Sequence, residues 1–100
     1  MDPVKVSPQY YTVRLENDRV RVLEWRLKPG GRMKMHSHPD GVVIVLADAT
    51  LKSTSADGTA TSSALHNAEV RWRNALAHSL ENVGSTEAHA LAIELKSGGE

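Results

Sequence analysis

The sequence predicts an all-β domain, and three observations support that fold class. The chain has 100 residues, which is enough for one domain with a single modest core. Turn signals rich in Gly, Pro, Asn and Asp recur at short intervals from Asn17 to Ser85. No window of about 11–18 residues keeps the apolar spacing of an amphipathic helix. Many short strands separated by regular turns are typical of a β-sandwich or a β-barrel.

The residues between these turns define the expected strands. Within the second strand, the apolar positions change parity between Val22 and Leu23, which predicts a β-bulge. The run from Val42 to Leu46 is apolar throughout and predicts a strand buried on both faces. The full set is expected at 10–15, 19–28, 32–38, 42–54, 59–66, 69–73, 77–82 and 87–96.

The second half of the chain contains a hairpin signal and a regular final strand. Asp57-Gly58 fits a two-residue type I′ turn, because both residues tolerate positive φ. The Ser- and Thr-rich segments on either side are therefore expected to form strands with a solvated outer face. In the last strand, Leu91, Ile93 and Leu95 alternate with Ala and Glu, so they share one face of a sheet.

Charge and composition exclude several classes of function. Twelve basic and twelve acidic residues give a formal net charge of zero, whereas non-specific nucleic-acid binding needs a basic surplus. The absence of Cys excludes disulfides and thiolate ligands. Neither a signal peptide nor a membrane span is recognisable, which predicts a cytoplasmic protein with no membrane partner. Four aromatic residues and no Phe make a thin core, which favours a homodimer.

The histidines supply the candidate chemistry. His36 and His38 are two residues apart on a predicted strand, so both imidazoles point to one face and can converge on one ion. Neutral imidazole is a common ligand of divalent metals. His78, which follows a turn-like segment, is the candidate third ligand. His66 and His89 belong to no such motif and are expected to be exposed strand residues.

Other polar and aromatic residues have two interpretations each. Lys34 shares strand parity with the paired histidines, so it either attracts an anionic ligand or lies at a solvated rim. Trp72 is either a pocket wall or a core residue. Asn82 is expected to hold a turn or a histidine in place. Arg71 and Arg73 lie on the opposite strand face from Trp72 and are expected to face solvent or an interface.

These motifs resemble those of the cupin family. The segment Gly-Gly-Arg-Met-Lys-Met-His-Ser-His at 30–38 is similar to the first cupin motif, G-x5-H-x-H-x3-4-E-x6-G, with Gly30 as its first glycine. The segment Ala-His-Ser-Leu-Glu-Asn at 77–82 is similar to the end of the second motif, G-x5-7-P-x-G-x2-H-x3-N. The resemblance covers about 19–96 and is greatest to short, single-domain bacterial cupins with a His-Ser-His-Pro-Asp segment.

The resemblance implies a fold, a cofactor and a site. The fold would be a cupin-type jelly-roll β-barrel in one domain, 1–100. Separately from the resemblance, the strand at 10–15 is expected in the dimer interface. The cofactor would be one divalent metal ion, of Fe, Zn, Ni, Mn or Cu, held by His36, His38 and His78 near the centre of the barrel.

The chain departs from the cupin motifs at the position of a metal ligand. Val42 and Val43 stand where the first motif has its glutamate, so a fourth ligand must come from Asp40, Glu24 or Glu94, or be absent. The P-x-G of the second motif reads Arg-Asn-Ala. Three protein ligands with open coordination positions are typical of catalytic metal sites, and an ion without a carboxylate ligand is the stronger Lewis acid.

Three functions are consistent with these residues and motifs. The first is a dioxygenase-like enzyme whose metal binds a small bidentate anion, such as a diketone enolate. The second is a non-catalytic sensor or carrier that binds a small molecule through the metal. The third is a structural barrel with vestigial histidines, which the departures from the motifs also favour.

Overall fold

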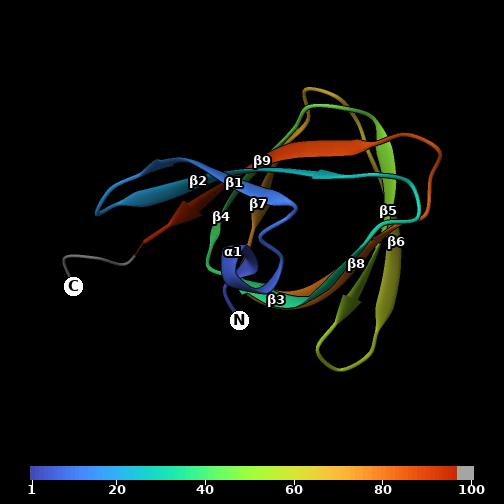
Figure 1. Ribbon diagram of the computed structural model, residues 1–100, viewed down its shortest axis with the longest axis horizontal. Coiled ribbons are helices and arrows are strands. Elements are labelled where there is room, and N and C mark those ends of the chain that lie inside the picture. The colour runs from blue at the N-terminus through green and yellow to red at the C-terminus, as the bar shows by residue number, and fades with distance from the viewer. Residues whose placement is uncertain (97–100) are drawn as a thin grey trace.

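The computed structural model describes residues 1–96 and is almost entirely β-structure (Figure 1), as the sequence predicts. One helical turn, α1 (Pro3–Val6), lies between the first and third strands. No helix within this part of the chain has the length and apolarity to cross a membrane. The strands are β1 (Tyr11–Glu16), β2 (Val20–Leu27), β3 (Arg32–His38), β4 (Gly41–Val45), β5 (Ala49–Ser55), β6 (Ala60–Leu65), β7 (Val70–Arg73), β8 (Leu76–Asn82) and β9 (Ala88–Leu95).

The strands form two antiparallel sheets that face each other across one core. The first sheet has the order β1-β2-β9-β4-β7 and the second has the order β3-β8-β5-β6. This is a jelly-roll arrangement, which confirms the predicted fold class. Within residues 1–96 no strand ladder joins the two sheets, so the expected barrel is not closed by hydrogen bonds.

The inner faces follow the period-two alternation of strands. In β2, Leu23, Trp25 and Leu27 point into the core and are at most 5% exposed. In β9 the small residues face inward, because Ala90 and Ala92 are fully buried and their bulky neighbours are not. The alternation predicted for β9 is therefore present, and its Leu and Ile residues lie on the outer face.

The bulge predicted in β2 is wrong. β2 pairs with β9 without interruption, and the register shift lies in β1, between Val13 and Leu15. The apolar parity of β2 changes because Arg21 occupies the inner face, where it forms an ion pair with Glu94. Apolar residues at the start of β2 consequently belong to the outer face of the sheet.

The strand predicted at 42–54 is two strands in different sheets, β4 and β5. The expected burial on both faces is also wrong, since Val43 and Ile44 are half-buried and Leu46 is 37% exposed. The physical reason is that the sheet containing β4 is covered by the core on its inner face alone. An apolar run therefore does not distinguish a fully buried strand from one with an apolar outer face.

The hairpin around Asp57 is confirmed, but its turn is not type I′. Among the described residues Ala68 is the single non-glycine with positive φ, so Asp57 does not adopt the required conformation. Gly58 has φ of 90°, and its N–H donates to the Ser55 carbonyl. A type I turn followed by a left-handed glycine fits this pattern. The adjoining strand β6 is exposed along most of its length, as predicted.

The outer face of the five-stranded sheet carries an apolar row that crosses all five strands. Leu15, Val22, Ile93, Val42 and Trp72 are neighbours in consecutive ladders. Trp72 is 57% exposed, and Leu15 is 50% exposed. Contiguous apolar surface of this kind is typical of interaction sites. The homodimer stays a prediction.

Candidate metal centre

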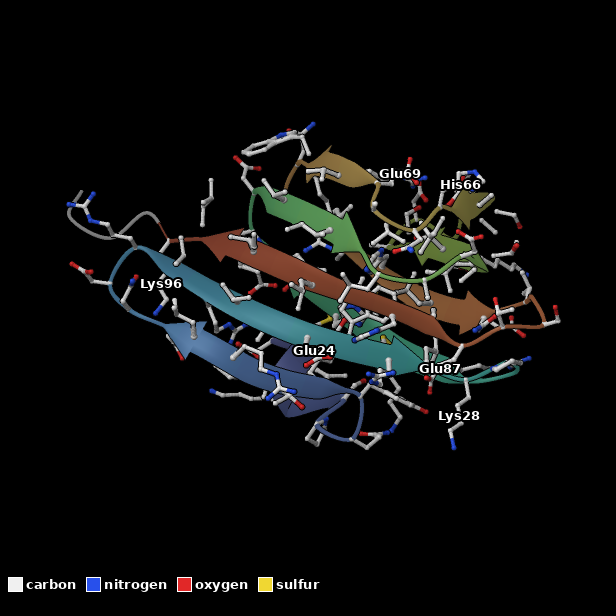
Figure 2. The ribbon with its side chains drawn as sticks, turned by 90° about the horizontal axis from the view of Figure 1, so that it is seen from above. Glu24, Lys28, His66, Glu69, Glu87 and Lys96 are labelled. Carbon is white, nitrogen blue, oxygen red and sulfur yellow. The ribbon has the colours of Figure 1, made fainter. Side chains whose placement is uncertain are left out.

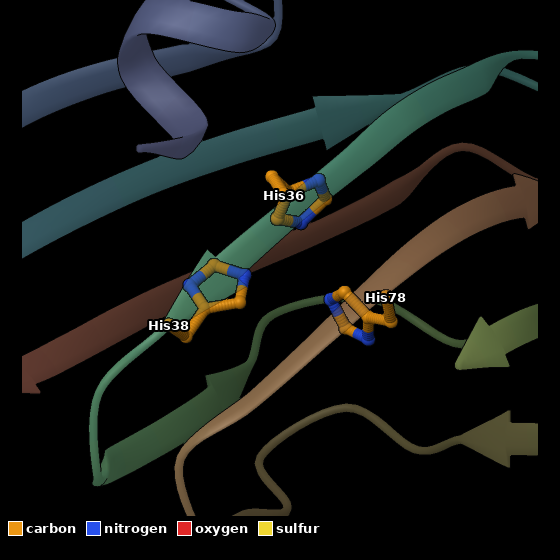
Figure 3. Close-up of side chains that lie close together, drawn as sticks. All are labelled: His36, His38 and His78. Carbon is orange, nitrogen blue, oxygen red and sulfur yellow. The ribbon is translucent and has the colours of Figure 1, made fainter. Parts of the chain in front are cut away.

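Three buried histidines converge between the sheets (Figure 3). His36 and His38 come from β3 and His78 comes from β8, where it lies directly opposite His36 in the ladder. The ring centroids are 4.8 to 5.3 Å apart, and the candidate ligand nitrogens all lie within 4.8 Å of one another. The structure thus brings together the three residues that the sequence singles out.

A bulge in β3 positions the first histidine and displaces the lysine beside it. The register shifts between Met33 and His36, so both side chains point inward although they are three residues apart. Lys34 is exposed on the strand's other side, and its predicted shared face with the histidines is wrong. Its carbonyl oxygen nevertheless accepts a hydrogen bond from Nδ1 of His36, at 2.7 Å.

In His36 and His38 the ring nitrogen that points away from the other histidines, Nδ1, donates a hydrogen bond to an oxygen. Nδ1 of His36 donates to the Lys34 carbonyl, and Nδ1 of His38 donates to Oε2 of Glu94 at 2.6 Å. Because these oxygens only accept, the protons reside on Nδ1 and the Nε2 atoms carry the lone pairs, with the Tyr11 hydroxyl 3.4 Å from Nε2 of His36. A carboxylate or carbonyl behind the ring is the usual support for a histidine that binds a metal through its other nitrogen.

His78 has one ring nitrogen beside a serine hydroxyl, which can donate or accept, and one buried ring nitrogen without a partner. Its Nδ1 is 3.1 Å from Oγ of Ser53. Its Nε2 is buried and makes no hydrogen bond. A buried polar atom without a partner costs free energy, and a divalent ion would satisfy it. The residues present therefore fit a metal ion, with three neutral imidazole nitrogens aimed at one place.

Burial keeps these histidines uncharged at neutral pH. It lowers the pKa of His36 to about 4 and, reinforced by the neighbouring histidines, lowers the pKa of His78 to about 3. Burial also lowers the pKa of His38, although the Glu94 hydrogen bond opposes that effect. Metal ligation requires deprotonated imidazole, so the site is in its ligand-competent form near pH 7.

Glu94 supports a histidine of this group and is itself held by an arginine. It is 2% exposed, and Oε1 accepts from Arg21 at 2.8 Å. Arg21 also pairs with Asp2, which caps α1. Although burial acts to raise it, the hydrogen bonds from His38 and Arg21 hold the pKa of Glu94 below its ordinary value. Both carboxylate oxygens are occupied, so Glu94 orients His38 and is not free to be a fourth ligand.

The other two carboxylates considered for that role lie elsewhere. Asp40 is exposed in the turn before β4, where its Oδ1 accepts from the backbone N–H of Ala75. Glu24 lies on the outer face of the first sheet (Figure 2), where it contacts Arg14 and His89. Among the described residues, the group of possible ligands consists of the three histidines alone.

The remaining sequence candidates hold the fold or lie on the surface. Asn82 is 2% exposed and fixes the turn after β8, because its side chain bonds the Leu27 and Thr86 carbonyls and the Gly84 N–H. Trp72 points outward at the rim of a pocket. His66 is exposed in a turn, and His89 bonds Glu24 on the outer face. Neither of these two histidines belongs to the three-histidine group.

Two residues at this site were missed by the sequence reasoning. Arg73 was expected to face solvent or an interface, but the inner face of β7 holds both Arg71 and Arg73 and the outer face holds Trp72. Tyr11 precedes the segment assigned to the barrel, yet its hydroxyl is buried 3.4 Å from Nε2 of His36. The sequence alone held no signal for Arg73, because the pairing of β7 with β4, which makes the apolar face of β7 the outer one, is visible only in the structure.

Acid is expected to destabilise the metal-free protein through these histidines. The unfolded chain takes up protons near the ordinary pKa of 6.5, whereas folded His36 and His78 do so near pH 4 and 3. Unfolding free energy should therefore fall between pH 6.5 and 5 by about 1.4 kcal/mol per pH unit for each histidine. Urea unfolding in a chelator measures this slope. His78→Gln should flatten it and His66→Gln should not, and equal slopes in both variants would contradict the account.

Comparisons with known proteins identify the family. No family model matches the sequence, and a search of curated proteins returns no significant match. A cupin domain from Bordetella pertussis Tohama I is 32% identical, with a TM-score of 0.79, over 87% of this chain and 92% of that one. Two further solved structures share the fold. One is a protein with a double-stranded β-helix domain from Klebsiella pneumoniae, with 20% identity and a TM-score of 0.68 over 89% of this chain and 76% of that one. The other is a cupin superfamily protein from Desulfitobacterium hafniense, with 18% identity and a TM-score of 0.64 over 87% of this chain and 76% of that one. The chain belongs to the cupin family.

Proposed function

We propose that this cupin binds one divalent metal ion through Nε2 of His36, His38 and His78 and is a dioxygenase-like enzyme for a small bidentate anion, such as a diketone enolate. The observation that carries the proposal is the convergence of three neutral imidazoles whose outer nitrogens are already bonded. The unpartnered Nε2 of His78 adds to it. When bound, the metal would supply Lewis-acid stabilisation of a chelating anion and an open position for a second reactant.

The protein's own residues would fix the ligand geometry and exclude water. Glu94 holds the ring of His38, and the β3 bulge holds the ring of His36. Val43 and Trp25 form apolar walls of a pocket of about 250 Å³ that also contains His78. This volume is below the roughly 300–1,000 Å³ of sites for drug-sized ligands, which suits a small substrate.

The proposed reaction is an oxidative cleavage in which the diketone itself supplies all the electrons that reduce O₂, so no other reductant is needed. One O₂ and one diketone give a carboxylic acid and a 2-oxoaldehyde, as the bond between a carbonyl carbon and the central carbon breaks and each fragment gains one oxygen atom. The protein would orient both reactants and stabilise the anionic one.

A non-catalytic metal-dependent binding module is the second candidate. The observation that favours it concerns Tyr11, whose hydroxyl lies within hydrogen-bonding distance of Nε2 of His36. Burial raises the pKa of Tyr11, so it keeps its proton at neutral pH and does not act as a general base. A carrier or sensor needs no such base.

Metal analysis and oxygen uptake distinguish these functions. The metal content of protein purified without a histidine tag should be one equivalent per chain. The Fe(II)-loaded form should then consume O₂ with at least one member of a panel of diketones, oxo acids, thiols and phenols. Stoichiometric metal without turnover would favour the binding module, and protein that takes up no added metal would contradict the proposal.

The absent cupin glutamate allows a gain-of-ligand prediction at Val43. Val43 packs against the core and lines the pocket with His78, whereas Val42 pairs with Trp72 on the outer face. Val43→Glu is expected to tighten metal binding by at least about tenfold, because an opposite charge in reach of the ion contributes more than about 1.4 kcal/mol. It should also lower turnover, because the added anion weakens the Lewis acid.

Val42→Glu is the matched control, since the same charge then lies outside the core and should leave metal affinity unchanged. Metal titration of both folded variants measures the difference. A folded Val43→Glu protein with wild-type metal affinity would contradict the placement of Val43 beside the metal. The new carboxylate would then pair with Arg71, which lies directly opposite on β7.

A further inference from the structure

Arg73 has a guanidinium edge that nothing in the described chain satisfies. Its Nε and Nη2 are both buried, and neither makes a hydrogen bond. These two nitrogens lie along the same edge of the planar guanidinium, so their N–H bonds point in parallel and form a fork. That fork matches the spacing of the two oxygens of a carboxylate.

The neighbouring charges explain why this fork is not already filled. Glu94 is the carboxylate close enough to act on Arg73 electrostatically, but its oxygens are committed to Arg21 and His38. Arg71, two residues away on the same face, is satisfied by Glu69 and by the Ala64 carbonyl. Of the three arginines on the inner face, Arg73 alone has both nitrogens of this edge buried and unbonded.

Arg73 shares a pocket with His78, one of the three histidines. The pocket of about 250 Å³ contains Arg73 and His78, and Trp25, Leu51 and Leu80 are among its apolar walls. Arg73 also lies near enough to lower the pKa of all three histidines. A divalent ion would add further positive charge to a place where burying a cation is already costly. An anion with oxygens at both ends would therefore offset the positive charge of Arg73 and of the metal together.

We propose that Arg73 determines substrate specificity by binding a carboxylate of the substrate through its Nε and Nη2. The substrate class is then a small oxo acid, with chelating oxygens directed to the histidines and a separate carboxylate directed to Arg73. This inference rests on the proposed function for the chelating end, while the contact with Arg73 is testable without it.

Two probes that differ by one carboxylate test the inference directly. Pentane-2,4-dione forms a chelating enolate. 2,4-Dioxopentanoate has the same β-diketone unit, with a carboxylate in place of one terminal methyl group. Calorimetric titration of the Zn(II)-loaded protein should show that the acid binds about 10- to 100-fold more tightly, as expected for a bidentate charged pair. Equal affinity for the two probes would overturn the inference.

Substitutions then assign the preference to the guanidinium fork. Arg73→Met should abolish the preference for the acid while changing the affinity for the dione by no more than about threefold. Arg71→Met removes a neighbouring positive charge and should preserve the preference. Arg73→Lys keeps the charge but not the fork and should give an intermediate value. Equal weakening of both probes by Arg73→Met would assign Arg73 a structural role and overturn the inference.

A nuclear magnetic resonance measurement separates this inference from the proposed function. The Nε–H signal of Arg73, assigned by its loss in Arg73→Lys, should shift saturably when 2,4-dioxopentanoate is added to metal-free wild-type protein. If the protein binds no metal and the signal still shifts, the proposed function fails and the anion site stands. If the protein binds metal and the signal does not respond, the anion site fails and the proposed function stands.

Discussion

Alanine at His36, His38 or His78 is expected to abolish stoichiometric metal binding. Each imidazole supplies one of three ligands, and loss of even an outer partner of a metal ligand costs about 10–100-fold in affinity. Removal of a ligand should therefore weaken binding by more than about 100-fold, measured by competition with a chromophoric chelator. All three histidines are buried and their ligand nitrogens lie close together, so each substitution should weaken metal binding to a similar extent.

His66→Ala and His89→Ala are the matched controls for those variants. His66 is exposed in a turn, and His89 contacts Glu24 on the outer face of the first sheet. Both substitutions should leave metal affinity within about twofold of the wild-type value, as surface changes usually have small effects. Equal losses in all five variants would show that the metal binds to histidines in general and not to this site.

Glu94→Gln is expected to affect both metal affinity and stability. The carboxylate accepts from Nδ1 of His38 and from Arg21 in a buried position. A glutamine amide has one acceptor oxygen for two donors and no charge, so the hydrogen bond that orients His38 is weakened or lost, which should weaken metal binding by about 10–100-fold. Arg21 loses its buried counterion, which should lower the unfolding free energy by on the order of 3 kcal/mol.

Glu24→Gln provides the control, because Glu24 also lies between a histidine and an arginine but on the solvated side. It should lower stability less than Glu94→Gln does, since Glu24 is half-buried and its partner Arg14 is exposed, and it should leave metal affinity unchanged. Chelator competition and urea unfolding measure the two effects separately. If Glu94→Gln reduced stability but bound metal as tightly as wild type, Glu94 would be a structural residue without influence on the site.

The histidine group was predictable because a strand has a simple period. Residues two apart share a face, so His36 and His38 converge whatever the rest of the fold does. His78 required the family motif, because nothing local indicates that β8 lies beside β3. Strand boundaries were predictable where turn residues separate the strands. The prediction failed between β4 and β5, because the apolar run continues past the end of β4 with no turn signal to mark it.

The polar part of the site was not predictable from alternation. Hydrophobicity patterns assume that apolar residues face the core, and on β7 that rule places Trp72 inside and Arg73 outside. The structure has the reverse, because the outer face of the sheet is apolar and the inner face carries charged groups beside the histidines. The β3 bulge similarly places Lys34 on the opposite face from the predicted one, since one inserted residue changes the face of every residue before it.

The central claim is that one ion binds to Nε2 of His36, His38 and His78. A crystal structure of the metal-loaded protein, with anomalous diffraction at the metal edge, tests it most directly. The account predicts a single anomalous peak per chain, about 2.0–2.2 Å from each of the three Nε2 atoms, with Glu94 still bonded to Nδ1 of His38. A peak that contacts fewer than three of these nitrogens, or one located at His66 or His89, would contradict it.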